Sequence, residues 1–117
     1  MKLRLYDDSL RLRLSQSEVA QFERAGRVES TVPFPGGRSL IYSIAAADVT
    51  ELSATLNDGR VAVLVPKPMA RIWLSPDQTG MENSSSTPRI LIEKDFQCLH
   101  RSTEEDADGF PNPLRGS

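Results

Sequence analysis

The sequence is poor in the residues that most catalytic and metal-binding sites use. Among its 117 residues there is one cysteine, Cys98, and one histidine, His100. A single cysteine cannot form an internal disulfide, so the fold does not depend on an oxidising compartment. The glycine-rich phosphate loops and the G-x-S-x-G nucleophile elbow are also absent. Nucleotide binding by a standard phosphate loop and α/β-hydrolase chemistry are therefore not predicted.

Charge of one sign and long apolar runs are lacking too. The chain has 14 lysines and arginines against 16 acidic residues, a formal net charge of −2. This balance provides no overall basic field for nucleic acid or an anionic membrane, so such binding would need a local patch. No apolar run approaches the roughly 20 residues that span a bilayer, and the N-terminus has no apolar signal core. We expect a cytoplasmic protein that does not contact membranes.

The composition that is present is typical of a globular protein. The hydrophobic fraction is 38% and the charged fraction 26%, and a chain of this length buries about two-thirds of its unfolded surface. We predict a single domain over residues 1–117. Its folded body would cover 1–100, and 101–117 would form an irregular acidic tail. The sequence shows no internal repeat.

Alternating apolar and polar residues predict about seven strands. Leu10, Leu12 and Leu14, for example, alternate with two arginines. An Asn-Asp-Gly turn at 57–59 lies between two such segments and indicates a tight hairpin. The polar, serine-rich residues 77–88 are predicted to be a mobile loop. The predicted strands cover residues 2–6, 9–14, 27–34, 38–44, 52–56 and 61–65, and one that begins at Arg89.

Two short helices are predicted between these strands. Ser15 and Glu18 fit a capping box, and Gly26 is a natural residue to end the helix that follows. Hairpins with two inserted helices favour an α+β fold: a curved, mostly antiparallel sheet or open barrel, closed on one side by the helices. The second helix follows two prolines, and its residues with helical spacing would dock on the sheet: Met69, Ile72 and Trp73.

The segment from Arg89 to His100, RILIEKDFQCLH, carries the densest chemistry in the chain. It begins as an apolar strand and continues into Glu93, Lys94 and Asp95. If the alternation persists, Lys94 points toward the core, which is unfavourable without a partner. We therefore predict a bulge near Glu93 and Lys94 that shifts the register.

A metal site is one alternative for this segment. Cys98 and His100 are two residues apart, and both could bind a divalent metal, with Glu93 or Asp95 and acids of the tail completing the site. The C-x-H pattern alone is weak evidence. A buried small cysteine beside a solvated histidine explains the pattern as well. Our first prediction is therefore that the protein has no cofactor.

The polar face of the N-terminal hairpin is a second candidate site, with four cations: Lys2, Arg4, Arg11 and Arg13. Like charges on adjacent strands repel, so something must offset them. RNA phosphates could do so, but the near-neutral net charge and the lack of a predicted aromatic platform favour internal pairing. The strand from Arg89 would then lie beside an N-terminal strand, with its acids on the arginine face. The acids available are Glu29, or Glu93 and Asp95.

Three parts of the sequence together resemble a known family. They are SLRLRLSQSEVAQFERAGRVE near the start, the Asn-Asp-Gly hairpin with VAVLVP, and LIEKDFQCLH followed by acids and FPNP. In this order they are similar to a group of small bacterial proteins of unknown function. The resemblance covers nearly the whole chain. It implies a single-domain cytoplasmic protein and transfers no activity, cofactor or functional residue.

These observations predict a small non-catalytic binding or protein-interaction module rather than an enzyme. We expect it to join a protein partner, or a second copy through an exposed strand edge. Metal-dependent activity around Cys98 and His100 is one alternative. RNA binding by the basic face of the N-terminal hairpin is the other, and nucleic acid is the less favoured partner.

Overall fold

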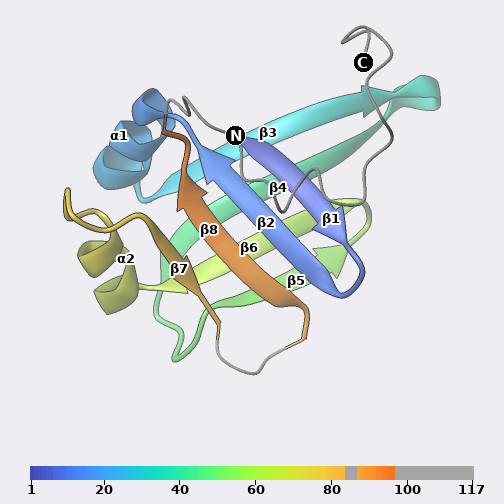
Figure 1. Cartoon of the computed structure of the whole chain (residues 1–117). Coiled ribbons are helices and arrows are strands. Elements are labelled where there is room, and N and C mark those ends of the chain that lie inside the picture. The colour runs from blue at the N-terminus through green and yellow to red at the C-terminus, as the bar shows by residue number, and fades with distance from the viewer. Residues whose placement is uncertain (84–86, 97–117) are drawn as a thin grey trace, which may run out of the picture.

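Eight strands and two helices build the part of the chain that the computed structural model describes, residues 1–83 and 87–96 (Figure 1). The predicted α+β class is confirmed. The helices are α1 (Gln16–Ala25) and α2 (Lys67–Trp73), and a short 3-10 turn covers Pro35–Gly37. The strands are β1 (Lys2–Tyr6), β2 (Ser9–Leu14), β3 (Arg27–Phe34), β4 (Arg38–Ala47), β5 (Ser53–Asn57), β6 (Arg60–Pro66), β7 (Gly80–Glu82) and β8 (Arg89–Lys94).

The described strands form two four-stranded sheets, which we call sheet A and sheet B. Sheet A has the strand order β1-β2-β8-β7, and sheet B has the order β3-β4-β6-β5. Four of the six strand pairs are antiparallel, and the central pair of each sheet is parallel. Figure 1 shows sheet A in front of sheet B, with both helices at one end. The prediction of mostly antiparallel strands is confirmed, and these strands close no barrel.

The two halves of the described chain repeat one arrangement of elements. The orders β1-β2-α1-β3-β4 and β5-β6-α2-β7-β8 are the same, and each half contributes one hairpin to each sheet. Equivalent residues in the hairpins and helices are 51 positions apart, the difference between 73 and 22. The repeat is difficult to detect in the sequence because few equivalent positions carry the same amino acid. Most share only a type of residue, apolar or turn-forming. Examples are Leu5 and Leu56, Asp7 and Asp58, and Phe22 and Trp73.

One apolar core lies between the sheets. Phe22 of α1 and Trp73 of α2 meet there edge to face, with ring centroids 5.9 Å apart. Such a pair contributes about 0.5–1.5 kcal/mol beyond its burial. The helices of the two halves therefore contact each other through equivalent aromatic residues. The remaining buried apolar residues are Leu10, Leu12, Leu14, Val28, Ile44, Leu52, Val63, Val65, Ala70, Met81, Ile90 and Ile92.

Helix α1 begins and ends where the sequence predicts. The Ser15 hydroxyl accepts a hydrogen bond from the Glu18 N–H at 3.4 Å, and the Glu18 carboxylate accepts one from the Ser15 N–H at 2.9 Å. Gly26 has a φ of 74° and donates its N–H to the Phe22 carbonyl at 2.7 Å. Residues with a Cβ seldom adopt this φ, so glycine ends the helix here.

Several large apolar residues are exposed, among them Ile72, which was predicted to dock on the sheet. Leu56 is 72% exposed, although it keeps the inward register of β5. In α2 the buried residues are Ala70 and Trp73, so Ile72 points away from the core. Val32 and Phe34, on the long β3–β4 hairpin, are exposed as well.

Strand β7 lies within residues 77–88, which were predicted to be a loop. Met81 is its one buried residue. A Cβ at Gly80 would lie 3.1 Å from the Ile92 carbonyl oxygen, so glycine permits the close approach of β7 to β8. Three residues are too few to show an alternating pattern, which is why the sequence does not reveal this strand.

Candidate binding surface

The parallel pairing of β2 with β8 places the segment that begins at Arg89 beside the N-terminal hairpin, as predicted. The register sets Arg13 opposite Glu93. Because the leucines of β2 point into the core, the residues between them form the outer face of sheet A. We take this face as the candidate binding surface. Its members are Lys2, Arg4, Tyr6, Ser9, Arg11, Arg13, Glu82, Arg89, Leu91 and Glu93.

Internal ion pairs neutralise part of the basic face, as predicted. The Glu93 Oε1 atom lies 3.3 Å from Nε of Arg11 and 3.7 Å from Nη2 of Arg13. This oxygen is buried and accepts no hydrogen bond of good geometry, so the guanidinium groups hold it through charge. At the N-terminal end, Lys2 lies 3.2 Å from Asp95. These side chains are partly exposed, and each pair contributes roughly 1 kcal/mol or less.

The third acid considered for this role, Glu29, is engaged elsewhere. It lies on β3 in sheet B, where it pairs with Arg27 and with Arg60, the latter at 3.0 Å. The cations of sheet A therefore rely on the acids at the end of β8. Glu93 and Asp95, and not Glu29, pair with these cations because β8 is the strand adjacent to β2.

Lys94 ends β8 on its inward side, in register with Leu14. Its Nζ donates hydrogen bonds to the carbonyls of Ser75 at 2.9 Å and Gln78 at 2.7 Å, and lies 5.4 Å from the centre of the Trp73 ring. The predicted bulge is wrong, because β8 keeps its register through Lys94. The segment after α2 supplies the partners that an inward-pointing ammonium group needs.

Tyr6 and Arg89 are among the members of the candidate binding surface that the sequence analysis did not single out. Tyr6 is 67% exposed, so an aromatic side chain does lie beside the arginines, contrary to expectation. Arg89 is exposed and forms no ion pair with any residue of the described ranges. The alternation that points Glu93 outward also points Arg89 outward, four residues earlier. This strand pattern was the signal that could have found it.

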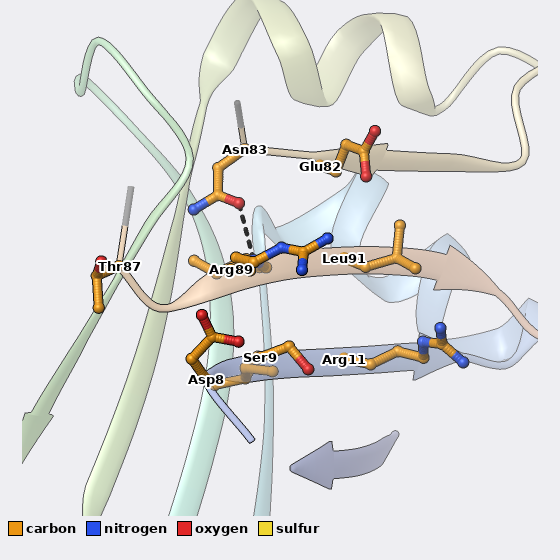
Figure 2. Close-up of a pocket in the computed structure, with 10 residues that line it drawn as sticks. Asp8, Ser9, Arg11, Glu82, Asn83, Thr87, Arg89 and Leu91 are labelled. Atoms are coloured by element: carbon orange, nitrogen blue, oxygen red, sulfur yellow. Dashed lines mark hydrogen bonds between the residues drawn. The ribbon is translucent and has the colours of Figure 1, made fainter. Parts of the chain in front are cut away.

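A polar pocket of about 620 Å³ opens on this surface, where the β1–β2 turn meets the start of β8. Figure 2 shows Arg89 on β8 with Glu82 on one side of that strand and Asp8 on the other. Arg11 lines the pocket further along β2, and Leu91 adds an apolar side chain. The pocket therefore brings both signs of charge to one place.

Hydrogen bonds hold the backbone around this pocket. The Asn83 N–H donates to the Ile90 carbonyl at 3.2 Å, and its side-chain oxygen accepts from the Ile90 N–H at 2.8 Å. The Asn83 side-chain amide donates to the Pro88 carbonyl at 2.9 Å. The Arg89 N–H donates to the Asp8 carbonyl at 2.9 Å, which ties β8 to the β1–β2 turn. These bonds set the positions of the segments that carry the charged side chains.

Glu18, the capping-box acid, has a further partner. Its carboxylate forms an ion pair with the Met1 ammonium group, and the Met1 carbonyl accepts a hydrogen bond from the Tyr42 hydroxyl at 2.7 Å. Burial raises the pKa of Glu18, but hydrogen bonds from the ammonium group and from Ser15 outweigh it, so the pKa lies below its ordinary value of 4.5. These contacts join α1 to β1 and β4, and they stabilise the fold.

The predicted metal site falls mostly outside the described residues. Cys98 and His100 lie beyond them, as does the acidic tail of residues 101–117. Within residues 1–83 and 87–96, no group of three or more His, Cys, Asp or Glu side chains is arranged to hold a metal ion. The two candidate ligands that are described, Glu93 and Asp95, face cations instead.

The chain is thus an α+β protein with two mixed sheets, one of which presents a charged outer face with a polar pocket. A family model described as "Family of unknown function (DUF7009)" matches residues 1–114, and the chain belongs to this family. The match confirms the resemblance to a family without an assigned function. No curated protein and no solved structure matches significantly. None of the described helices is long and apolar enough to cross a membrane.

Proposed function

We propose that the protein is a non-catalytic protein-interaction module that associates with a second copy of itself along the outer edge of β5. Sheet B of one copy would then continue into sheet B of the other. The observation that carries the proposal is the edge itself, an exposed and uncharged strand at the end of sheet B. Such an edge presents unpaired N–H and C=O groups to another strand.

The other described sheet edges are protected in ways that β5 is not. Strand β7 has only three residues. Strand β3 carries Pro33, which has no N–H to donate. Strand β1 is the equivalent of β5 in the repeat, and it carries Lys2 and Arg4. The sequence of β5, Ser-Ala-Thr-Leu-Asn, contains neither charge nor proline.

The residues of β5 are complementary to themselves in antiparallel pairing. The β5–β6 register closes at Asn57, so Thr55 directs its backbone groups toward β6, and Ala54 and Leu56 direct theirs toward the free edge. A two-fold axis at Thr55 sets Ala54 of one copy opposite Leu56 of the other. It also sets the two copies of Thr55 opposite each other. An apolar pair and a threonine pair are both favourable across strands.

Strand β1 does not allow the same contact. The equivalent axis would pass through Arg4 and set two guanidinium groups opposite each other, which is destabilising. A two-fold contact through β5 also leaves no second β5 edge free, so the assembly closes as a dimer. The charges of β1 therefore restrict self-association to β5.

The contact is small, because it consists of five residues from each copy. Stable interfaces bury about 1,200–2,000 Å² in total, and a single strand pair falls below this range. We therefore expect a dissociation constant roughly between micromolar and millimolar. The dimer would form and separate with concentration.

Sedimentation equilibrium between about 10 µM and 1 mM tests the proposal, because this range spans the expected dissociation constant. Thr55→Arg places at the axis the residue that β1 has at the equivalent position. Thr31→Arg makes the same change on β3, at the opposite edge of sheet B, and is the matched control. We expect the average mass of wild type and Thr31→Arg to rise toward two chains, and that of Thr55→Arg to remain at one. A single-chain mass for wild type throughout, or equal association of both variants, would overturn the proposal.

RNA binding by the arginine face is the competing function. Tyr6 favours it, since an exposed aromatic side chain can stack on a base. Glu93 and Asp95 oppose it, because they already pair with the cations and would repel phosphates. A mobility shift with single-stranded RNA that weakens as salt rises would assign RNA binding to the arginine face, and the absence of a shift would exclude this function.

A cytoplasmic location in a bacterium belongs to the same proposal. The single cysteine supports the location, because secreted proteins of this size often rely on disulfides. The bacterial source is carried over from the resemblance of the sequence alone.

A further inference from the structure

We propose that the pocket on the outer face of sheet A binds a small zwitterion, a ligand with one carboxylate or phosphate group and one ammonium group. A free amino acid or a short peptide has this chemistry. The inference goes beyond the association of β5, since the pocket lies on the other sheet and shares no residue with that edge.

The volume and position of the pocket suit a small ligand. Its roughly 620 Å³ lies within the range of about 300–1,000 Å³ that is common for small-molecule sites. Its walls come from three neighbouring strands, β2, β8 and β7, and from the turn before β2 (Figure 2). A ligand placed there would contact residues that are far apart in the sequence.

Three of the four charged residues that line the pocket lack the ion pairs found elsewhere on this face. Arg89, Glu82 and Asp8 form no ion pair with any described residue, although all three line the same pocket. Arg11 shares one Glu93 oxygen with a second arginine, which leaves its other guanidinium nitrogens available. Unpaired charges of both signs therefore surround one space.

This balance of charges selects the ligand class. Two arginines face two carboxylates, so the pocket has no net charge. A polyanion such as RNA would meet Glu82 and Asp8, and a simple cation would meet the arginines. A zwitterion can place its anion near Arg89 and its ammonium group near a carboxylate, and so satisfy both signs.

The surrounding hydrogen bonds support the inference, because they preorganise the backbone of the pocket in the absence of a ligand. Asn83 uses its N–H and both side-chain groups to hold the backbone of Pro88 and Ile90 at the start of β8. The Ser9 hydroxyl donates to the Tyr6 carbonyl at 2.6 Å and fixes the neighbouring turn. Binding then requires little ordering of the backbone, which lowers its entropic cost.

The test is an NMR titration of the ¹⁵N-labelled full chain with glycylglycine, and separately with acetate and with ethylammonium. We expect saturable shifts of the Ser9, Arg11 and Arg89 amides with glycylglycine. Acetate or ethylammonium alone should bind at least about tenfold more weakly, since each satisfies one sign of charge. Arg89→Met should weaken glycylglycine binding more than about tenfold. Arg38→Met, which removes an exposed arginine from sheet B, should leave it unchanged.

Three results would overturn the inference. The first is the absence of a saturable shift with glycylglycine. The second is equal binding of acetate and glycylglycine, which would show a plain anion site. The third is that Arg89→Met and Arg38→Met weaken the binding of glycylglycine equally. A well-dispersed spectrum of Arg89→Met establishes that the variant is folded, and the Thr55→Arg protein should bind glycylglycine as wild type does.

Discussion

Replacing Lys94 with methionine removes three interactions at once and keeps most of the apolar length of the side chain. The ammonium group donates to the carbonyls of Ser75 and Gln78 and lies over the Trp73 ring. These contacts tie the end of β8 to the segment that follows α2. The substitution therefore measures how much this connection contributes to the free energy of unfolding.

The magnitude follows from the contacts. A hydrogen bond to a charged group contributes about 1.5–3 kcal/mol, and a cation–π contact about 0.5–1 kcal/mol when it is partly exposed. The Lys94 bonds are partly buried, so water can replace some of what is lost. The methionine also retains the packing of the stem. We expect a loss of roughly 2–3 kcal/mol in total.

Urea denaturation is the assay, with Lys67→Met as the matched control. Lys67 lies 3.3 Å from Asp48 on the surface, and pairs of this kind contribute less than about 1 kcal/mol. With a urea dependence of about 1–3 kcal/mol per molar, Lys94→Met should lower the midpoint by roughly 1–2 M. A change below about 0.5 kcal/mol, or one equal to the control, would refute the role assigned to Lys94.

Three further substitutions test the fold. The Glu18 carboxylate stabilises wild type above pH 4.5, and this contribution is lost as the pH falls through the lowered pKa of the folded protein, so Glu18→Gln should lack it at every pH. Urea unfolding of both proteins at several pH values from about 2 to 6 measures the difference in the free energy of unfolding. Ser15→Ala should cost about 1 kcal/mol by removing the cap of α1, and a loss near zero in thermal unfolding would contradict the capping box. Phe22→Ala should cost about 3–5 kcal/mol by opening a cavity beside Trp73, as calorimetry can show.

Sequence reasoning succeeded where the determining residues are close together in the chain. Ser15, Glu18 and Gly26 define α1 within a few residues of its ends, and the structure confirms both ends. The pairing of the Arg89 strand with the N-terminal hairpin was also predicted correctly. That prediction depended on charge, because the arginines of β2 needed acids and Glu93 could provide one.

The features that escaped prediction depend on residues far apart in the chain. Lys94 finds its partners in the backbone carbonyls of Ser75 and Gln78, and no side-chain pattern encodes those. The pocket likewise forms because β7 lies on one side of Arg89 and the β1–β2 turn lies on the other. The alternation of a strand indicates which residues share a face, but it does not indicate which strands are neighbours.

The central claim is that two copies associate through β5 with their axis at Thr55, and oxidative cross-linking tests it most directly. In the Cys98→Ser background, Thr55→Cys would set two thiols opposite each other in a non-hydrogen-bonded pair, about 4.5 Å apart between Cα atoms, within the range that a disulfide spans. Asn57→Cys is the control, because Ser53 of the second copy would lie opposite it. We predict a covalent dimer under mild oxidation for Thr55→Cys and none for Asn57→Cys. No dimer from Thr55→Cys, or equal cross-linking of both variants, would contradict the account.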